Sequence, residues 1–280
     1  MTSLLGDAAG RLLTAATSLA LLAVIFAPLE RVFRGRRRFA RRPALGLDLA
    51  FFFWQHVLWT GAVATGLAAA AARLDPTLAP LRAPLSAVPL WGQAVIAWVL
   101  GDLLLYGGHR LQHRVDWLWR FHRLHHTAEE VDWLAAFREH PLDGLYTRAL
   151  VNLPAILMGF SLSTIAGLIA FRGLWAVFIH ANVKLPVGPL KYLMGAPSLH
   201  RWHHDRERGG RVNFANLMPF WDVVFGTYYE PAEQPEAFGA EGPTPRRYWA
   251  ALLEPLGLRL DRESKPQRAP EGAEPESEMG

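Results

Sequence analysis

Three long apolar segments constrain the fold of this 280-residue chain more than any other feature of its sequence. Leu12 to Leu29 carries no charged residue, Leu49 to Ala72 has only His56 as a titratable group, and Val88 to Gly108 has only Asp102. Each segment is long enough to cross about 30 Å of hydrocarbon as a helix. We therefore predict an all-α, integral membrane helical bundle with three spanning helices.

The orientation of this bundle follows from arginines between the first two apolar segments: Arg31, Arg34, Arg36, Arg37, Arg38, Arg41 and Arg42. Positive loops stay in the cytoplasm, so the third segment should return there near Gly108, in the cytoplasmic membrane if the source is bacterial. Topology and anionic lipid explain these juxtamembrane arginines better than nucleic acid, and we predict no nucleic-acid partner. A fourth apolar region, Leu150 to Ile179, is interrupted by proline and glycines, and we expect a helical hairpin that enters and leaves the membrane on one side.

Histidine spacing points to a metal site. Eight of the eleven histidines form three short clusters, and a ninth lies between the last two clusters. The nine are His109, His113, His122, His125, His126, His180, His200, His203 and His204. Imidazoles three or four residues apart project from one face of a helix. Three such turns supply more nitrogen donors than one four-coordinate zinc ion uses, so the pattern predicts a histidine-rich, two-metal cap on the cytosolic side of the bundle.

Missing residues narrow the kind of metal site. The chain has no cysteine, which excludes thiolate zinc fingers, iron–sulfur clusters and disulfides. The Glu-x-x-His pairs of ferritin-like bundles and the H-E-x-x-H motif of zinc proteases are also absent. Imidazole binds iron, zinc, copper and nickel, so the ligands alone leave the ion open. The chain has no G-x-G-x-x-G motif or P-loop, so it shows no recognisable nucleotide or flavin site.

Metal-bound imidazoles need acceptors for their second ring nitrogen. Asp102, two helical turns before His109, is the first candidate for this role. Further candidates are Asp132, Asp205 and Asp222. His140 precedes a proline, which favours a loop position where it either ligates a metal or only hydrogen-bonds.

Two parts of the sequence resemble a known family. The stretch from Asp102 to Asp143, DLLLYGGHRLQHRVDWLWRFHRLHHTAEEVDWLAAFREHPLD, is similar to the histidine core of the fatty acid hydroxylase and sterol desaturase superfamily. His180 to Asp205 and Asn213 to Pro231 resemble its later blocks in order and spacing. The likeness divides the chain into transmembrane helices with a basic cytosolic loop (1–94), a catalytic domain (95–231) and a C-terminal extension with a disordered tail (232–280).

This resemblance implies an integral membrane di-iron oxygenase that uses O2 and two electrons to hydroxylate or desaturate a C–H bond of a lipid, whether sterol-like, fatty acyl or related. It implies that the nine histidines hold two iron ions, with zinc as the alternative in purified protein. A ferredoxin or cytochrome b5-like protein would be the electron donor. Lys184 stands four residues after His180, where some members carry a further histidine. One metal would then lack a protein ligand or take His140.

Two other functions stay open. A membrane metal-binding or metal-transport protein should place its ligands at membrane depth, whereas these clusters lie beyond the apolar segments. Two zinc ions could instead activate water for lipid hydrolysis, although the chain shows no conspicuous nucleophile or bridging carboxylate. For the oxygenase we expect an apolar tract between the spanning helices to guide the lipid, so that Gly101→Trp lowers turnover and leaves metal content unchanged.

Overall fold

The computed structural model describes residues 2–36, 42, 44–82, 87–160, 166–185 and 187–258. Within these residues the regular secondary structure is helical, without strands, and two isolated bridges join Arg34 to Val183 and Asp205 to Phe238. The all-α prediction is confirmed. Arg37, Arg38 and Arg41 of the basic loop and the predicted tail beyond residue 258 lie outside the described residues.

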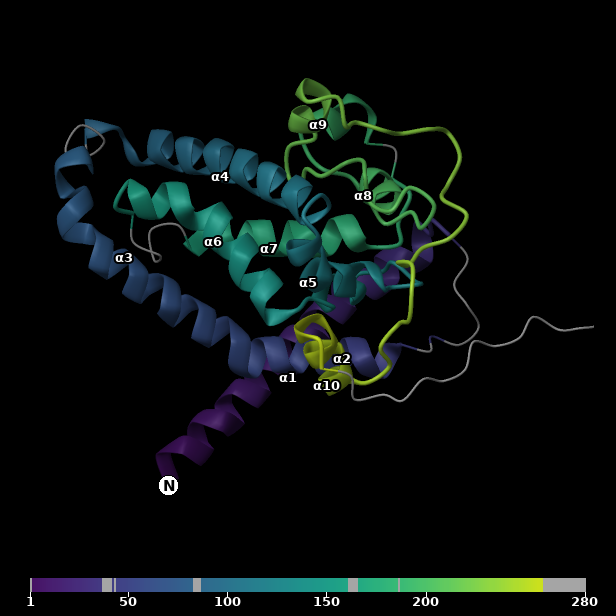
Figure 1. Ribbon diagram of the computed structural model, residues 1–280, viewed down its shortest axis with the longest axis horizontal. Coiled ribbons are helices and arrows are strands. Elements are labelled where there is room, and N and C mark those ends of the chain that lie inside the picture. Colours follow the sequence, from purple (N-terminus) through teal and green to yellow (C-terminus); the bar gives the residue numbers. More distant parts are fainter. Residues whose placement is uncertain are drawn as a thin grey trace, which may run out of the picture.

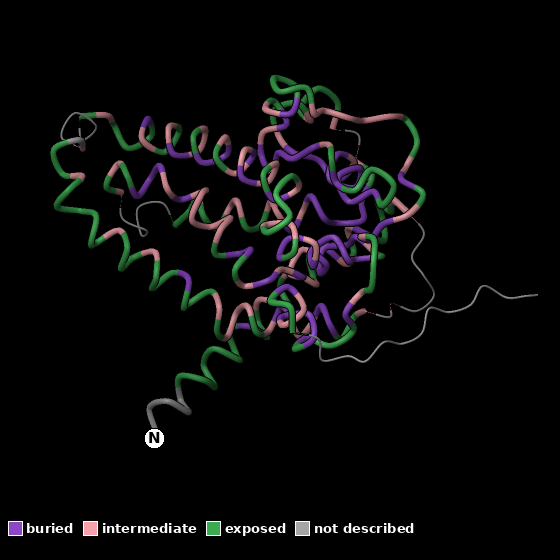
Figure 2. Tube along the Cα trace, in the orientation of Figure 1, coloured by how far each residue is buried: buried purple, intermediate pink, exposed green. Residues whose placement is uncertain are grey.

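Three helical segments are long and apolar enough to cross a membrane (Figure 1), as predicted. The first is Asp7–Val32 of α1 (Thr2–Val32). The second, Leu45–Pro80, runs through α2 (Leu45–Trp54), a π-helical turn η1 (Gln55–Trp59) and α3 (Thr60–Arg82). The third is α4 (Leu90–Gln112). The tube in Figure 2 is largely exposed along α3 and the outer part of α1, as expected for apolar surfaces that face lipid.

Helix α4 packs closely against α6 (Pro141–Leu157), and two glycines make this contact possible. A Cβ atom at Gly101 would lie 2.5 Å from the carbonyl oxygen of Val151, and one at Gly108 would collide with the side chain of Leu150. The two helices therefore leave no space for a lipid chain at these positions. The expected effect of Gly101→Trp needs correction, because a tryptophan there would force the helices apart instead of narrowing a tract.

A cap of short helices covers one end of the spanning helices. It contains α5 (Asp116–His126), η3 (Ala135–Phe137), η4 (Gly188–Tyr192), α8 (Pro197–His203), α9 (Phe220–Val224), α10 (Tyr248–Leu253) and η5 (Glu254–Leu256). Helix α7 (Ala166–His180) leads into it. The region from 150 to 179 thus holds the end of α6 and all of α7, with residues 161–165 not described. Its path relative to the membrane stays a prediction.

Buried charges connect the second spanning helix to the cap. The guanidinium of Arg138, 1% exposed after η3, donates from Nε to Asp48 Oδ1 of α2 at 2.6 Å. Arg42 donates to Asp48 Oδ2 at 2.6 Å and to Asp132 Oδ1 at 2.8 Å. Removing one partner of such a network would leave an uncompensated buried charge, so α2 and the cap are held in one relative position.

Backbone pairing connects the end of α1 to the segment that follows α7. The amide of Gly35 donates to the carbonyl of Asn182 at 3.0 Å, and the amide of Lys184 donates to the carbonyl of Phe33 at 2.7 Å. Glu30, which is buried, accepts from the amides of Trp133 and Asn182. The end of the first spanning helix is thus bonded to the segment before η3 and to the segment after α7.

Candidate metal centre

All nine histidines predicted as ligands lie near helix ends, on α5 and α8 of the cap and on the adjoining ends of α4 and α7. His109 is in the last turn of α4, and His113 caps that helix. The cluster His122, His125 and His126 forms the last turn of α5, and His180 ends α7. His200 and His203 lie on α8, with His204 as its C-cap. Each sequence cluster is therefore one helical turn, as its spacing predicts.

The nine side chains form two groups, in each of which one nitrogen per ring lies within 4.8 Å of the others. We name them the five-histidine group (His109, His113, His122, His126 and His203) and the four-histidine group (His125, His180, His200 and His204). The rings of His126 and His204, one from each group, stack with centroids 4.5 Å apart. Two neighbouring sites, each built from nitrogen donors, are the result.

The hydrogen bonds of the four-histidine group show which ring nitrogens carry a proton, and so whether a cation fits between the rings. The Nδ1–H of His125 donates to the carbonyl of Arg138 at 3.2 Å, and the Nδ1–H of His180 donates to the carbonyl of Ala176 at 2.6 Å. A neutral imidazole carries one proton, so both Nε2 atoms are bare acceptors. These two Nε2 atoms lie 3.0 Å apart. Two lone pairs that face each other at this distance repel unless a cation lies between them.

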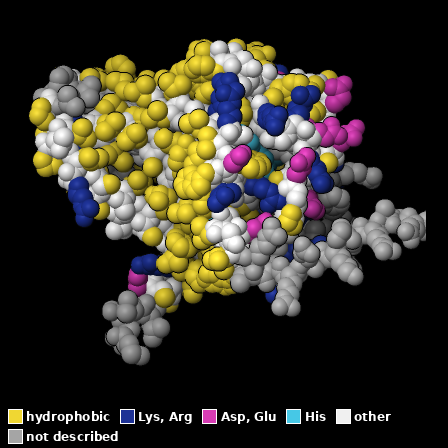
Figure 3. All heavy atoms as spheres, viewed as in Figure 1, with side chains coloured by type: hydrophobic (Ala, Val, Ile, Leu, Met, Phe, Trp, Pro, Cys, Tyr) yellow, Lys and Arg dark blue, Asp and Glu magenta, His cyan; other side chains and the backbone are white. Residues whose placement is uncertain are grey.

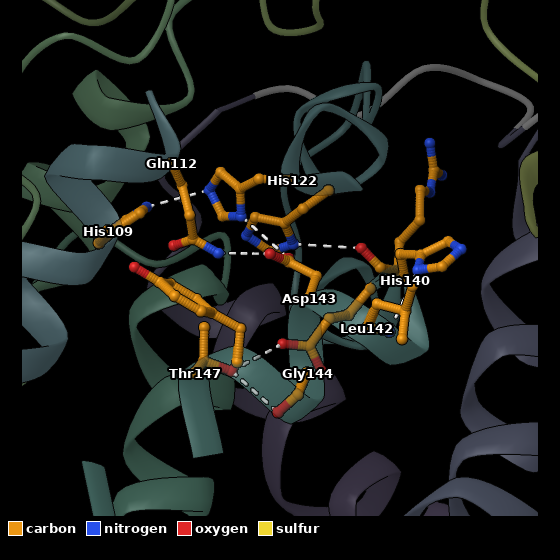
Figure 4. Close-up of polar contacts among 12 residues, drawn as sticks. His109, Gln112, His122, His140, Leu142, Asp143, Gly144 and Thr147 are labelled. Atoms are coloured by element: carbon orange, nitrogen blue, oxygen red, sulfur yellow. Dashed lines mark hydrogen bonds and ion pairs between the residues drawn. The ribbon is translucent and has the colours of Figure 1, made fainter. Parts of the chain in front are cut away.

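The five-histidine group shows the same pairing (Figure 4). The Nδ1–H of His109 donates to the carbonyl of Phe214 at 2.7 Å, and the Nδ1–H of His122 donates to Asp143 Oδ2 at 2.9 Å. Their Nε2 atoms are 3.1 Å apart. Nitrogens about 3 Å apart are what neighbouring ligands show when each binds one ion at about 2.0–2.1 Å.

Protonation offers no other way to relieve these contacts. Burial lowers the pKa of His122 and of His125 well below the ordinary value, and the neighbouring imidazoles lower both further. Neutral rings are the form that binds metals. Several further ring nitrogens are buried without a hydrogen-bond partner among the described residues: Nε2 of His126 and His203, Nδ1 of His200 and His204, and both nitrogens of His113. The donor set therefore fits metal ions.

The acceptor that the sequence pattern did not reveal is Asp143, in the first turn of α6. It is 4% exposed, and burial raises its pKa to about 7. One of its oxygens accepts from His122, and the other accepts from the side-chain amide of Gln112 (Figure 4). Backbone carbonyls complete the set, including that of Val212, which accepts from His203 Nδ1 at 2.8 Å. No spacing rule points to carbonyls that come from so far along the chain.

Asp102 and Asp222 take a different part from the one predicted. Both oxygens of Asp102 accept from backbone amides, those of Leu217 and Met218. Asp222 accepts from the amides of Phe214 and Ala215. The two carboxylates therefore hold the loop whose Phe214 carbonyl orients His109, and they act on the rings only through that loop.

The other two predicted acceptors also hold backbone. Asp132 accepts from the amides of Leu134 and Ala135. Asp205 accepts from the amide of Arg208 at 3.2 Å.

His140 lies outside both histidine groups. Its Nδ1 accepts from the amide of Leu142 at 3.1 Å, where it caps α6, and its Nε2–H donates to the carbonyl of Leu252 at 3.2 Å. Both nitrogens are therefore used, and His140 is a helix cap in this structure. Lys184 is exposed and joins neither group. The four-histidine group thus has one imidazole fewer than its neighbour.

One group is open to the surface. A pocket of about 380 Å³ is lined by His113 and His126 of the five-histidine group, together with Trp119 and the segment 205–211. Gly210, at φ +69°, is buried between the lining residues Gly209 and Arg211: an added Cβ atom would lie 2.8 Å from Nδ1 of His113 and 3.0 Å from Cε1 of His126. Figure 3 shows histidine atoms among charged side chains, where the charged part of this face meets the apolar part.

Several known proteins are similar to part of this chain. The chain is 31% identical over 177 residues to an ornithine lipid hydroxylase of Rhizobium tropici. This match covers 62% of this chain and 54% of the relative. It is 34% identical over 128 residues to the human alkylglycerol monooxygenase (45% and 28%), and 30% identical over 161 residues to a very-long-chain aldehyde decarbonylase of Oryza sativa subsp. indica (50% and 25%). The chain thus spans about half the length of these relatives or less.

No solved structure matches the chain. The family model described as fatty acid hydroxylase matches residues 94–227, which include all nine grouped histidines, Asp143 and the loop held by Asp102. The predicted superfamily resemblance is confirmed: residues 94–227 of this chain match the family model described as fatty acid hydroxylase.

Proposed function

We propose that this protein is a membrane-bound di-iron oxygenase that hydroxylates or desaturates a C–H bond of a lipid, with electrons from a separate donor protein. The observation that carries the proposal is the pair of bare Nε2 atoms in each histidine group, 3.1 Å apart in one and 3.0 Å apart in the other. Each pair requires a cation, and the groups adjoin through His126 and His204. The nine grouped histidines are the proposed ligands.

Iron is the proposed metal because the relatives include a hydroxylase and a monooxygenase, and imidazole suits iron as well as zinc. In a hydroxylation, two bound iron ions would supply the activation of O2, so that one oxygen atom enters a C–H bond and the other leaves as water with two electrons and two protons. The protein positions the ligands. Asp143 and the carbonyls of Arg138, Phe214 and Val212 fix ring tautomers and orientations.

No residue of the four-histidine group lines the pocket, whereas His113 and His126 do, so we propose that substrate reaches the metal centre through the five-histidine group. We propose that this end of the bundle faces the cytosol. Arg31, Arg34 and Arg36 lie at the same end of α1 as the cap, and positive residues are retained on that side. A basic surface there would steer an acidic electron donor, such as a ferredoxin or cytochrome b5-like protein.

The test is to express the full chain and its His125→Ala variant in a host that lacks the gene, and to compare metal content and membrane lipids. We expect iron in the wild-type protein and a lipid product heavier by one oxygen or lighter by two hydrogens. In His125→Ala, the ion of the four-histidine group and the lipid product should both be lost. His140→Ala is the matched control, because that ring lies outside both groups, and it should keep the metal and the product.

Metal transport is the alternative that this experiment also tests. Transport requires ligands at membrane depth, whereas both histidine groups lie in the cap and at the ends of α4 and α7. Iron or zinc flux across vesicles without O2 uptake in the presence of a reductant would overturn the oxygenase proposal.

A further inference from the structure

The pocket at the five-histidine group is lined by charges of both signs. Its volume of about 380 Å³ falls within the range of small-molecule sites, about 300–1,000 Å³. The positive residues that line it are Arg206, Arg208 and Arg211, and the negative ones are Asp116, Asp205, Glu207 and Glu241. A pocket built to accept only a hydrocarbon chain would carry apolar side chains at these positions. The lining therefore indicates a polar and charged ligand.

Most of these charges are free to bind a ligand. In the described part of the chain, Arg206, Arg211, Asp116 and Glu207 form no ion pair with one another or with other residues. Arg208 is positioned by Tyr229: its guanidinium lies 3.8 Å from the ring centroid and donates to the hydroxyl. Guanidinium groups bind phosphate or carboxylate through two parallel hydrogen bonds, and carboxylates bind ammonium groups.

An apolar surface adjoins the charged pocket. Leu111, Val115 and Trp117 surround the turn from α4 into α5, next to the pocket residues His113 and Asp116, and their side chains are 49%, 41% and 60% exposed. They continue from a spanning helix, so they lie where a lipid chain leaves the hydrocarbon region. The close packing of α4 against α6 at Gly101 and Gly108 leaves no route between those helices.

We propose that this pocket binds a zwitterionic lipid headgroup, with its anionic group on Arg206 and Arg211, its ammonium group on Asp116 and Glu207, and its chain along Leu111, Val115 and Trp117. The part of the lipid nearest the metal centre is then the headgroup or its point of attachment, and not the end of an acyl chain. This inference rests on the proposed lipid oxidation and names the substrate class of the same site.

The test measures binding, without reductant, to the full chain in nonionic detergent micelles. Four probes separate the contributions: lysophosphatidylethanolamine, lysophosphatidic acid and monoacylglycerol with one common acyl chain, and glycerophosphoethanolamine with none. Lipid retained per chain is quantified by mass spectrometry over a concentration series. We expect lysophosphatidylethanolamine to bind most tightly and lysophosphatidic acid more weakly, because it lacks the ammonium group. Monoacylglycerol lacks both charged groups and glycerophosphoethanolamine lacks the chain, so each should bind at least about tenfold more weakly than the first.

Charge variants locate the binding site. Arg206→Gln combined with Arg211→Gln should weaken both phosphate-bearing lysolipids about tenfold, whereas Arg206→Lys combined with Arg211→Lys should weaken them less. Asp116→Asn combined with Glu207→Gln should weaken lysophosphatidylethanolamine alone. Arg246→Gln is the matched control, an exposed arginine outside the pocket, and should change nothing. All these residues are exposed, so each variant should fold like the wild type. Metal content equal to that of the wild type checks this.

Three results would overturn the inference: tight binding of monoacylglycerol, binding of glycerophosphoethanolamine as tight as that of the lysolipid, or unchanged affinity in the double arginine variant. The second result would mean that the pocket takes a soluble zwitterion. Because binding is measured without electron transfer, charge-dependent binding with no lipid oxidation would count against the proposed function alone. Lipid oxidation with charge-independent binding would count against this inference alone.

Discussion

The two histidine groups are made of the same side chain but differ in access. The five-histidine group has His113 and His126 on the wall of a surface pocket, whereas the four rings of the other group are all buried. The four-histidine group also has the smaller donor set. Under the proposed function, the contrast predicts that substrate reaches the five-histidine group and that the four-histidine group mainly holds its ion.

The largest effect is expected when a histidine of the four-histidine group is removed. His125→Ala should lose the ion of the four-histidine group and all lipid oxidation, because only three imidazoles remain to hold that ion. His113→Ala should keep both ions with weaker binding, because four imidazoles remain and the pocket admits water. Elemental analysis of the purified proteins measures this difference. Equal metal loss in the two variants would remove the functional distinction between the groups.

A second prediction concerns Gly210, which packs against two rings of the five-histidine group. Gly210→Ala should reduce metal in the five-histidine group and lower activity strongly, since its Cβ atom would press on His113 and His126. Gly209→Ala is the matched control: φ there is +57°, but nothing lies within 4 Å of the added Cβ atom. It should cost only about 1–2 kcal/mol of backbone strain and leave metal content unchanged. If Gly209→Ala and Gly210→Ala lose the same metal, strain and not contact with the rings explains the effect.

A third prediction concerns Asp143, whose carboxylate accepts from His122 of the five-histidine group. Asp143→Asn should weaken metal binding about 10–100-fold, because the charged acceptor of His122 is lost while the shape is kept. A chelator titration measures the change. Glu139→Gln, which alters a carboxylate bonded to Arg148 and Thr147, serves as the control and should titrate like the wild type. Similar chelator sensitivity in both variants would show that Asp143 acts only through general stability.

The smallest effect is expected in the spanning helices, away from both groups. Gly101→Ala should destabilise the protein by about 1–3 kcal/mol, because its Cβ atom meets the carbonyl of Val151 at 2.5 Å. Gly107→Ala, on the same helix with nothing within 4 Å of the added atom, should be neutral. Thermal melts in detergent report both. Metal content should follow the wild type in each variant while it is folded, and a melt of Gly101→Ala equal to that of Gly107→Ala would contradict the close packing of α4 on α6.

The spanning helices could be predicted because their signal is local. A run of apolar residues is typical of a membrane-spanning helix, and each predicted segment overlaps one of the three candidate spans, although the third segment begins two residues before α4. The structure extends these helices by several residues, because charged residues such as Asp7 near the ends do not interrupt a helix. The tract expected near Gly101 was wrong, since a glycine in sequence shows neither close packing nor free space until its neighbour on α6 is known.

The grouped histidines could be named from the sequence because helical periodicity places each cluster on one turn. Their division into groups of five and four depends on how α5 and α8 meet, which no spacing reports. The hydrogen-bond acceptors of the imidazole rings were harder to predict from the sequence. Asp102 looked suitable by position on its helix, yet it holds Leu217 and Met218, while Asp143 reaches His122 from a helix whose approach is purely tertiary.

The carbonyls of Val212 and Phe214 have a consequence for how the protein is made. They follow every histidine of both groups in the chain, and they fix the protons of His203 and His109. A nascent chain that has emerged only as far as residue 204 carries all nine imidazoles but lacks these two acceptors. Under the proposed function, the complete metal centre would therefore form only after residues 212–214 have been synthesised.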